Sequence, residues 1–537
     1  MGRETKAAIA MVQEAYDIEK NAGVAHRVAT GGHPYERPQT PEICRGGSPC
    51  PPVLPSSSIL SEMVVETSKD RLISPTACGI ALAGVFIAER IILVIVGIRF
   101  NIDALSWYWQ VFDPVLLREN LFESLFFLHS QPPLLNLVLG LALKLSPNGA
   151  ALLLHGLFFG LGLGLAMTLF FGLVELHWPP RIAALAVAVA ALTPGWIVYE
   201  NWLFYDFPVL VLLAVACVAL LRFARTEEWG IFVLFTVAVS AVALTRSLFH
   251  LVWVVVSLGM IMAIQPRLGI RRSVVGLVIP LVLVGGWYAK NQVVFGFFGS
   301  SSWLGLSLAK TATARLDPED RGALVADGVL SSWALVKPFS PLERYEAAAG
   351  MHFEDSEVEA LGQRIKASGH PNFNHRGFVD ISAVCRRDAF AVILSQPSLY
   401  LNSVVTAVRR FFSSAVAYPP FLDNLVVMAP VYRFGEMTWS RPVAVAAAFG
   451  GALLISILAA LTAFRQGGRA EGFIWLWVIW TLLWVLVVGS LVEVGENHRF
   501  RFLVTPLVWL TMADAGRRLW CQLRADSLAS CKKPQEE

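Results

Sequence analysis

The sequence predicts an all-α membrane protein that crosses the bilayer many times. Of its 537 residues, 55% are hydrophobic and only 15% are charged, and the mean hydropathy is +0.59. A soluble domain of this size would be about 25% charged. Several apolar runs of about 20 residues are long enough to span the hydrocarbon core of a bilayer. The formal net charge of +3 is small, so we expect no nucleic-acid partner.

The apolar runs predict about ten or eleven transmembrane helices. Residues 1–75 are rich in Pro, Gly and Ser, which predicts a disordered cytoplasmic tail and leaves both Met1 and Met63 open as the start. The first apolar run begins near Thr76 and is expected to act as an uncleaved anchor. The predicted spans are 76–98, 149–174, 181–198, 207–223, 229–245, 247–264, 272–290, 441–464, 472–492 and 500–516.

Basic residues predict the direction of these spans, because Lys and Arg in short loops stay on the cytoplasmic side. Several spans are followed by such residues: Arg222, Arg225, Arg267, Arg271, Arg272, Arg465, Arg469, Arg517, Arg518, Lys532 and Lys533. Alternation then places 199–206 and 493–499 outside. It also divides the chain into a transmembrane module (76–290), an extracytoplasmic loop (291–440), C-terminal transmembrane helices (441–516) and a cytoplasmic tail (517–537).

The apolar run 132–145 does not fit a full crossing. Basic residues before the first span place the N-terminus inside, so Phe100 at the end of that span is outside. Counting back from 199–206 puts Gly149 outside as well. The run therefore begins and ends on one face, and at about 14 residues it is short for a crossing. We expect a helix that lies in the membrane interface or dips part-way into the bilayer, with 113–129 as an amphipathic companion.

The first outer loop, 99–148, combines acids, tryptophans and a Pro pair where a simple helix hairpin would have a short turn. It is too polar to cross a bilayer and too apolar to be a free loop. A surface of this kind suits a ligand that is part lipid and part polar. We therefore interpret the loop as part of an active site.

Five pieces of sequence on this predicted outer face resemble one known superfamily. They are Asp103, HSQPPLLN at 129–136, YDFPVLVLL at 205–213, GGWYAKNQVVFG at 285–296 and ENHRFRFLVTPLVWL at 496–510. Their order and placement are similar to those of the GT-C membrane glycosyltransferases, which include protein O-mannosyltransferases and bacterial lipid A aminoarabinose transferases. The chain departs from well-known members in having Ser-Gln before the Pro pair and Ile-Asp-Ala where many have Asp-Glu. The resemblance implies a GT-C-like bundle with interfacial helices in the first outer loop and one large extracytoplasmic loop.

The resemblance also implies a reaction. Such enzymes move a sugar from a polyprenyl phosphate or pyrophosphate carrier to a protein, lipid or glycan acceptor, with inversion, outside the cytosol. A carboxylate acts as general base and cationic or metal groups hold the carrier phosphate. Whether a divalent metal is needed stays open. The lack of paired outer cysteines favours a bacterial inner membrane.

Three acids are candidates for the catalytic carboxylates. Asp103 is the expected base, although its position also suits a helix cap. Asp206 resembles the second acid of the superfamily, as a supporting acid or metal ligand, and Glu200 is its rival. A carboxylate at the mouth of a span costs little where water reaches it, so position alone does not prove a role.

Cations and polar groups on the outer face are candidates for substrate binding, because outward-facing cations need an anionic partner. A carrier phosphate would serve, and ion pairs with Glu493 or Glu496 are the alternative. His129 beside the Pro pair can donate to phosphate or ligate a metal. The expected binding residues are His129, Gln131, Arg246, His250, Lys290, Asn291, Glu496, Arg499 and Arg501. Of these, Lys290 and Asn291 resemble the Trp-x-x-Arg-Asn pattern of the superfamily.

The loop 291–440 is long enough for a small helical cap, ending in an amphipathic stretch at 399–417. Asp380, His375 and Arg376 are available there for acceptor contacts, but no motif selects them.

Two other classes of function stay open. A lipid-linked sugar flippase or transporter should show an internal repeat and broken helices near the midplane, and no convincing repeat is visible. A non-catalytic scaffold that binds a partner through its outer loop is the other alternative.

Overall fold

The computed structural model describes residues 74–264, 269–430, 432–433 and 441–530. The predicted tail before residue 74, the end of the chain after residue 530 and the basic residue Arg267 lie outside the described residues. The chain divides into a first unit, Met1–Ile80, and a second, Ala81–Glu537. Everything that follows concerns the second unit.

The described residues of this unit form helices and no strand, apart from isolated bridges such as Asn101 with Trp202. The first half comprises α3 (Pro75–Val96), α4 (Ala104–Trp107), α5 (Pro114–Glu119), α6 (Leu121–Phe126), α7 (Pro133–Leu145), α8 (Ala150–Glu175), α9 (Pro180–Ala191), α10 (Pro194–Glu200), α11 (Asp206–Thr226), α12 (Trp229–Thr245), α13 (Leu251–Ile264), α14 (Ile270–Pro280), η1 (Leu281–Gly285) and α15 (Gly286–Phe295). The second half comprises α16 (Leu304–Thr311), η2 (Thr313–Arg315), α17 (Pro318–Ala326), η3 (Ser332–Leu335), α18 (Leu342–Ala349), α19 (Glu359–Gly362), α20 (Gly377–Ser395), α21 (Pro397–Phe411), η4 (Pro419–Phe421), α22 (Leu422–Val427), α24 (Pro442–Arg465), α25 (Arg469–Val492), α26 (Asn497–Leu503) and α27 (Thr505–Ser530).

The helices confirm an integral, multi-pass, all-α membrane protein. Six helices are long and apolar enough to cross a bilayer, or up to eight if two bent pairs each count as one span. This is fewer than the ten or eleven expected from the sequence. The difference arises partly because α12 and α13 have only 17 and 14 residues, each shorter than the roughly 20 that a straight crossing needs.

Proline breaks two of the predicted spans and changes the helical geometry of a third, which stays continuous over Gly276–Phe295. The predicted span 181–198 is two helices, α9 and α10, bent by 66°. Pro194 explains the break, because proline disfavours a helical conformation in the residue before it and cannot donate its own N–H. The span 272–290 contains the five-residue π-helix η1 directly after Pro280. The span 500–516 begins as α26 and ends within α27, with Pro506 at the start of the second helix.

The last helix also runs further than expected. The apolar pattern of the sequence ends the final span at residue 516 and predicts a tail from 517. Instead, α27 continues to Ser530. Its later turns carry Arg517 and Arg518, which pair with Asp514, and Arg518 also pairs with Glu471. These ion pairs explain why the helix persists past the apolar stretch.

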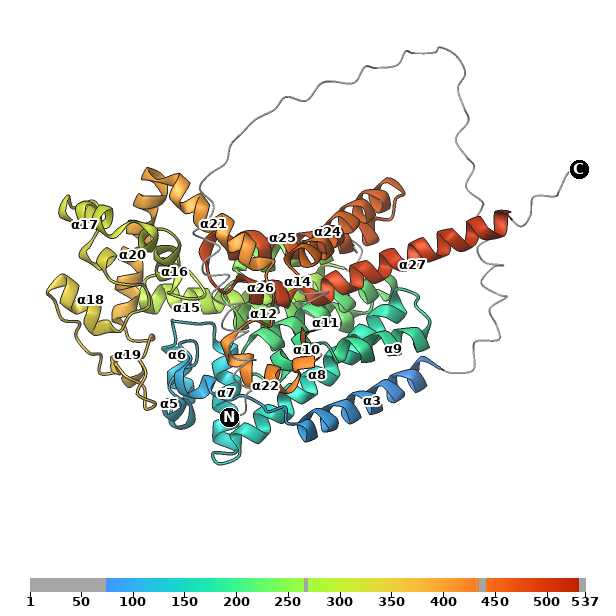
Figure 1. Ribbon diagram of the computed structural model, residues 1–537, viewed down its shortest axis with the longest axis horizontal. Helices are drawn as coiled ribbons and strands as arrows, with labels where there is room; N and C mark the ends of the chain where they lie inside the picture. Colours follow the sequence, from blue (N-terminus) through green and yellow to red (C-terminus); the bar gives the residue numbers. More distant parts are fainter. Residues whose placement is uncertain (1–73, 265–268, 431, 434–440, 531–537) are drawn as a thin grey trace, which may run out of the picture. The chain divides into compact units, whose positions relative to one another are not determined.

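Helix α11 forms the centre of the bundle. It packs against α8, α12 and α26, and 72% of its apolar window is buried, compared with 33% for α24. In Figure 1 α11 lies among α8, α12 and α10. The first residue of α11 is Asp206, so the central helix brings a carboxylate to the end of the bundle.

The first outer loop, residues 99–148, connects the end of α3 to the start of α8, and both of these helix ends lie at the same end of the bundle. Phe100, just after α3, stacks on His155 in the second turn of α8, with ring centroids 4.9 Å apart. The intervening α7 has 13 residues and is therefore about 20 Å long, against roughly 30 Å for the hydrocarbon core. Both observations support the expectation that α7 does not cross, whereas its place in a membrane interface stays a prediction.

The residues after α15 are here called the outer segment (residues 296–430). They fold into helices of which α21 packs on α25 and α26 of the bundle, and α22 packs on α10. Helices α16 and α20 pack closely, because a Cβ on Gly305 would lie 1.7 Å from the Ser382 carbonyl oxygen. An apolar cluster around Leu306, Tyr345 and Phe378 forms part of its core. The predicted amphipathic stretch 399–417 corresponds to α21, which ends earlier, at Phe411.

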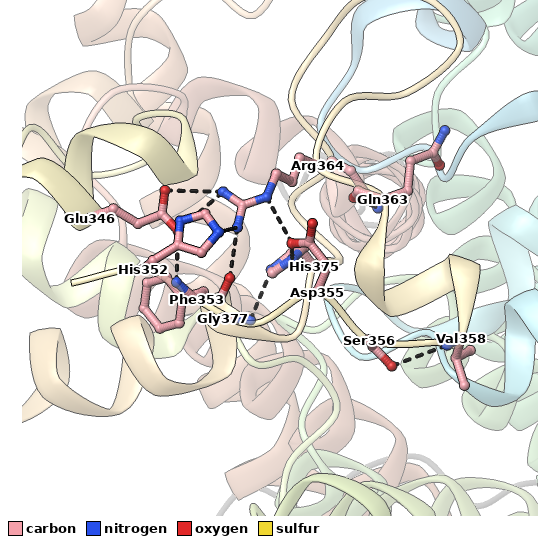
Figure 2. A network of polar contacts seen from close by, with 11 residues as sticks. Glu346, His352, Phe353, Asp355, Ser356, Val358, Gln363, Arg364, His375 and Gly377 are labelled. Atoms are coloured by element: carbon pink, nitrogen blue, oxygen red, sulfur yellow. Dashed lines mark hydrogen bonds and ion pairs between the residues drawn. The ribbon is translucent and has the colours of Figure 1, made fainter.

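Arg364 is the centre of a polar network that ties together the loops of the outer segment (Figure 2). Its Nε donates to Asp355 (2.7 Å), its Nη1 to Glu346 (3.0 Å) and its Nη2 to the carbonyl of Phe353 (2.7 Å). His375 Nε2 lies 3.2 Å from the same Asp355 carboxylate. Burial raises the pKa of Glu346 and Asp355, but hydrogen bonds outweigh it and hold the pKa of both carboxyls below the usual range. The donors are Arg364 and the Phe353 N–H for Glu346, and His375 and Arg364 for Asp355.

Candidate functional site

A cavity of about 1340 Å³ lies where the ends of the central helices meet the outer segment. Its inner part is formed by the start of α11, the turn between α12 and α13, and the turn between α25 and α26. The first outer loop contributes Trp107, Trp109 and Gln131. The outer segment supplies the remaining wall. Segments that are far apart in the sequence thus share one chamber at one end of the bundle.

The floor of the cavity is a cluster of four charges. Arg499 Nε donates to Asp206 at 2.9 Å, and its Nη2 forms an ion pair with the same oxygen at 2.7 Å. Arg246 pairs with the other oxygen of that carboxylate. Arg499 Nη1 contacts Glu496 at 2.5 Å. Tyr418 donates its hydroxyl to Glu496 at 3.0 Å. We call Asp206, Arg246, Glu496 and Arg499 the charge quartet.

Asp206 is fully buried and holds two guanidinium groups, so it is not a free base. Its carboxylate instead fixes the positions of Arg246 and Arg499, both of which line the cavity. Removing two cations from water is costly, and a shared counter-ion offsets much of that cost.

Aromatic rings complete the surroundings of the two arginines. The Arg499 guanidinium lies 4.7 Å from the Phe204 ring centroid and 5.0 Å from that of Trp202. The Arg246 guanidinium lies 4.5 Å from Phe500 and 4.7 Å from Tyr205. Cation–π contacts of this kind are strongest when the cation is desolvated. They help to hold both arginines at the cavity floor.

Arg246 has hydrogen-bond donors that its ion pair with Asp206 does not use. Its Nη1 faces Asp206, while its Nε and Nη2 form no hydrogen bond to any residue in the described part of the chain. His250, which follows in the same turn, also lines the cavity. An anion that entered the cavity could therefore accept from Arg246 without breaking the charge quartet.

One wall of the cavity is apolar. Trp484, Val488 and Val492 recur at four-residue spacing on α25, so they lie on one face of that helix and line the cavity together with Leu248. Trp484 is anchored by a 2.9 Å hydrogen bond from its indole to the carbonyl of Leu248. The cavity therefore joins a charged floor to a wall that suits a hydrocarbon chain.

The outer segment adds charged groups that the sequence analysis missed. Seven basic and three acidic residues line the cavity in total. Four basic side chains from the outer segment make no hydrogen bond or ion pair with any other described residue: Arg315, Arg321, Lys337 and Arg386. The carboxylate of Asp380 is likewise without such a partner. No motif marks these residues in the sequence, because they lie on three helices and a turn that come together only in the fold: η2, α17, α20 and the turn at Lys337.

His129 lies outside the cavity lining and is fully buried. Its Nδ1 is 2.9 Å from the Ser302 hydroxyl and its Nε2 is 2.9 Å from the carbonyl of Asn374. Burial, with a contribution from the Lys290 ammonium, lowers the pKa of His129 to about 3. Both ring nitrogens are thus occupied within the protein. The geometry gives His129 a structural role in place of the expected phosphate or metal contact.

Three further candidates cap backbone carbonyls instead of lining the cavity. Lys290 donates to the carbonyl of Leu128 at 2.6 Å, and Asn291 donates to that of Gly299 at 2.7 Å. Arg501 donates to the carbonyls of residues 411 and 413, both at 2.9 Å. These contacts fasten the outer segment and the first loop to the bundle.

The two remaining acids are also away from the cavity lining. Asp103 is exposed at the start of α4, where it accepts a hydrogen bond from the Asn101 amide at 3.2 Å. Glu200 accepts a bidentate pair from Arg90, with distances from 2.8 to 3.1 Å. Of the sequence-predicted residues, Gln131, Arg246, His250, Glu496 and Arg499 line the cavity, and Asp206 lies directly behind it.

Within the described residues, no three His, Cys, Asp or Glu side chains are placed to hold a metal ion together. The carboxylates nearest the cavity floor, Asp206 and Glu496, are instead paired with arginine. Comparisons with protein-family models, with curated proteins and with solved structures find no match to this chain.

Proposed function

We propose that this protein is an inverting, GT-C-like glycosyltransferase that moves a sugar from a polyprenyl-phosphate carrier to an acceptor on the extracytoplasmic face of a bacterial inner membrane. One observation carries the proposal. A single cavity of about 1340 Å³ combines an arginine floor, an apolar helix wall and an excess of basic residues over acids. A lipid-linked phosphate has the matching halves, a hydrocarbon chain and an anionic group next to the sugar.

The carrier phosphate would be held at the cavity floor. Arg246 offers Nε and Nη2, and the fork geometry of a guanidinium suits a phosphate oxygen pair. His250 lies beside it. The charge quartet keeps Arg246 in place before substrate arrives, so little reorganisation is needed on binding. The lipid chain would follow the α25 wall formed by Trp484, Val488 and Val492.

Asp380 is the best-placed general base. It lines the cavity from α20 and its carboxylate is unpaired, whereas Asp103 is exposed away from the cavity and Asp206 holds two arginines. In the proposed step, the acceptor hydroxyl oxygen bonds to the anomeric carbon while the bond from that carbon to the phosphate oxygen breaks. The acceptor proton goes to the carboxylate, and polyprenyl phosphate leaves with the bonding electron pair.

The test uses the full chain in lipid nanodiscs with a radiolabelled polyprenyl-phosphate hexose and a mixture of acceptors. We expect free polyprenyl phosphate to accumulate, and Arg246→Gln to lower its rate by at least tenfold through the loss of a charged contact. Arg344→Gln, an exposed arginine of α18 that does not line the cavity, is the matched control. Absence of carrier release with every sugar donor tried would contradict the proposal.

A comparison of two acids tests the choice of base. Asp380→Asn should lower the transfer rate about 100-fold or more, in the range of general-base catalysis, with carrier binding retained. Asp103→Asn should have a much smaller effect, because its carboxylate is outside the cavity lining. If Asp103→Asn lowers the transfer rate more than Asp380→Asn does, Asp103 is the general base, and the glycosyltransferase proposal is unaffected.

A lipid-linked sugar flippase is the second candidate, favoured by the 66° break between α9 and α10 and by the π-helix η1. Interrupted helices are common in transporters. A flippase would move the intact lipid-linked sugar between leaflets and release no free carrier. The release assay therefore separates the two functions directly.

A further inference from the structure

The outer wall of the cavity carries more positive charge than a carrier phosphate requires. A polyprenyl phosphodiester has one negative charge, and Arg246 on the floor already offers it two free donors. The part of the lining that comes from the outer segment includes four basic side chains without an ion pair, Arg315, Arg321, Lys337 and Arg386, and one unpaired acid, Asp380. These five side chains together carry about three net positive charges and form no ion pair with a described residue, although Glu493, which is paired with Lys310, also acts electrostatically on Arg315.

Arg321 shows that part of this charge is removed from water. Its Nε is buried and has no hydrogen-bond partner among the residues that the structure describes. A buried donor without a partner costs free energy that a bound acceptor would recover. Arg315, by contrast, is exposed, so the basic groups extend from the interior of the cavity to its rim.

Two tryptophan side chains of the first outer loop also line the cavity. Trp107 and Trp109 each line the cavity and are each 44% exposed, and Trp109 stacks on Phe339 with ring centroids 5.2 Å apart. Exposed indole faces provide flat apolar area with a polar edge. They suit the C–H faces of sugar rings, whereas an extended peptide would need backbone donors and acceptors along a groove.

From these observations we infer that the acceptor is an acidic glycan, a sugar chain with carboxylate or phosphate groups, held by the basic wall of the outer segment. This inference rests on the proposed function, since it assigns the second substrate of the same cavity. Arginine and lysine bind the anionic groups, Trp107 and Trp109 stack on the rings, and Asp380 meets the acceptor hydroxyl.

The test measures binding to the full chain in nanodiscs of zwitterionic lipid. The probes are hexagalacturonate, a phosphorylated maltohexaose, neutral maltohexaose and a hexaglutamate peptide. We expect the two acidic glycans to bind at least tenfold more tightly than the neutral one, with affinity that falls as salt is raised from low to physiological concentration. The ratio between the two acidic glycans identifies carboxylate or phosphate as the preferred charge.

The double variant K337A/R386A should weaken acidic-glycan binding about tenfold, because it removes two charged contacts. The control R344A/R409A removes the same charge from two exposed arginines of the outer segment that do not line the cavity, and should change binding by less than about twofold. Equal binding of neutral and acidic glycans, or equal losses in both double variants, would overturn the inference. So would hexaglutamate binding as tightly as the acidic glycans, which would indicate a peptide acceptor.

Binding of polyprenyl phosphate is measured in parallel, with Arg246→Gln as its variant. K337A/R386A should leave it unchanged within about twofold, because neither residue is on the cavity floor. If the protein binds polyprenyl phosphate but binds acidic and neutral glycans equally well, only the assignment of the acceptor is wrong. If the protein binds acidic glycans more tightly than neutral ones but does not bind polyprenyl phosphate, only the proposed function is wrong.

Discussion

At the scale of single residues, the chemistry of the site depends on which charged groups are paired. Asp206 has two arginines, and Asp380 has no partner among the described residues. The first is fully buried and the second is exposed. A buried carboxylate that neutralises two cations holds structure, while an unpaired one beside a cavity can accept a proton.

Asp206→Asn should therefore destabilise the protein strongly. The change leaves two buried guanidinium groups close together without their shared counter-ion, which costs about 3–5 kcal/mol. Thermal unfolding followed by size-exclusion chromatography in detergent would measure it. Asp380→Asn is the control and should change stability by less than about 0.5 kcal/mol. Equal stability of the two variants would remove the structural role assigned to Asp206.

His129 makes stability depend on pH. Its pKa is lowered to about 3 in the fold, so between that value and about 6.5 the unfolded chain binds a proton that the folded protein does not. Stability is then full above pH 6.5 and decreases as the pH falls. At pH 5 the loss from this one group is about 2 kcal/mol.

The variant His129→Asn should be less stable at pH 7.5 but lose less stability on acidification, as measured by urea unfolding at pH 7.5, 6 and 5. Burial also lowers the pKa of His498 to about 3, but that residue contributes the same slope to both proteins. Parallel pH profiles for wild type and variant would show that His129 is not the group responsible.

At the scale of elements, short helices and proline breaks decide which groups reach the cavity. Helix α7 is 13 residues long, and the Phe100–His155 stack brings the end of α3 beside the start of α8. Pro194 turns α10 away from α9, so Glu200 meets Arg90 instead of the cavity. A local break therefore separates two acids, Glu200 and Asp206, that are only a few residues apart.

Cysteine labelling tests the path of the chain. In a background where Cys44, Cys50, Cys521 and Cys531 are replaced by Ser, leaving only the buried Cys78, Cys217 and Cys385, S106C and N148C should react with an impermeant maleimide from the same side of a sealed membrane. E227C, at the far end of α11, should react only from the opposite side. Labelling of N148C together with E227C would show that α7 crosses, and would separate the first loop from the cavity.

At the scale of the whole described unit, the cavity exists because the outer segment is fastened to the first loop. Lys366 is buried and donates to the carbonyls of Tyr108 (2.9 Å) and Val111 (3.0 Å). Asn374 bonds the backbone of residues 127–130 and the carbonyl of Ala360. Burial lowers the pKa of Lys366 to about 8, partly offset by the Asp113 carboxylate.

Asn374→Ala should loosen this attachment. It leaves the N–H groups of His129 and Ser130 and two backbone carbonyls without their partner, at a cost of roughly 3 kcal/mol or more. We expect faster proteolysis within the outer segment and lower carrier release, with the transmembrane helices still protected. Asn402→Ala, on the exposed face of α21, should leave both unchanged. Unaltered proteolysis of N374A would contradict the fastening role.

The all-α, multi-pass class follows from the sequence alone, because long apolar runs and a low content of charged residues are local properties of the chain. It also indicated that Gln131, Arg246, His250, Glu496 and Arg499 belong to one face, and the cavity brings them together. Which charges are paired becomes visible only in the fold. The partners of Asp206, Glu200 and His129 lie far away in the chain, and the basic wall comes from several separate elements without a motif. Pairing and burial depend on three-dimensional distance, which local periodicity does not encode.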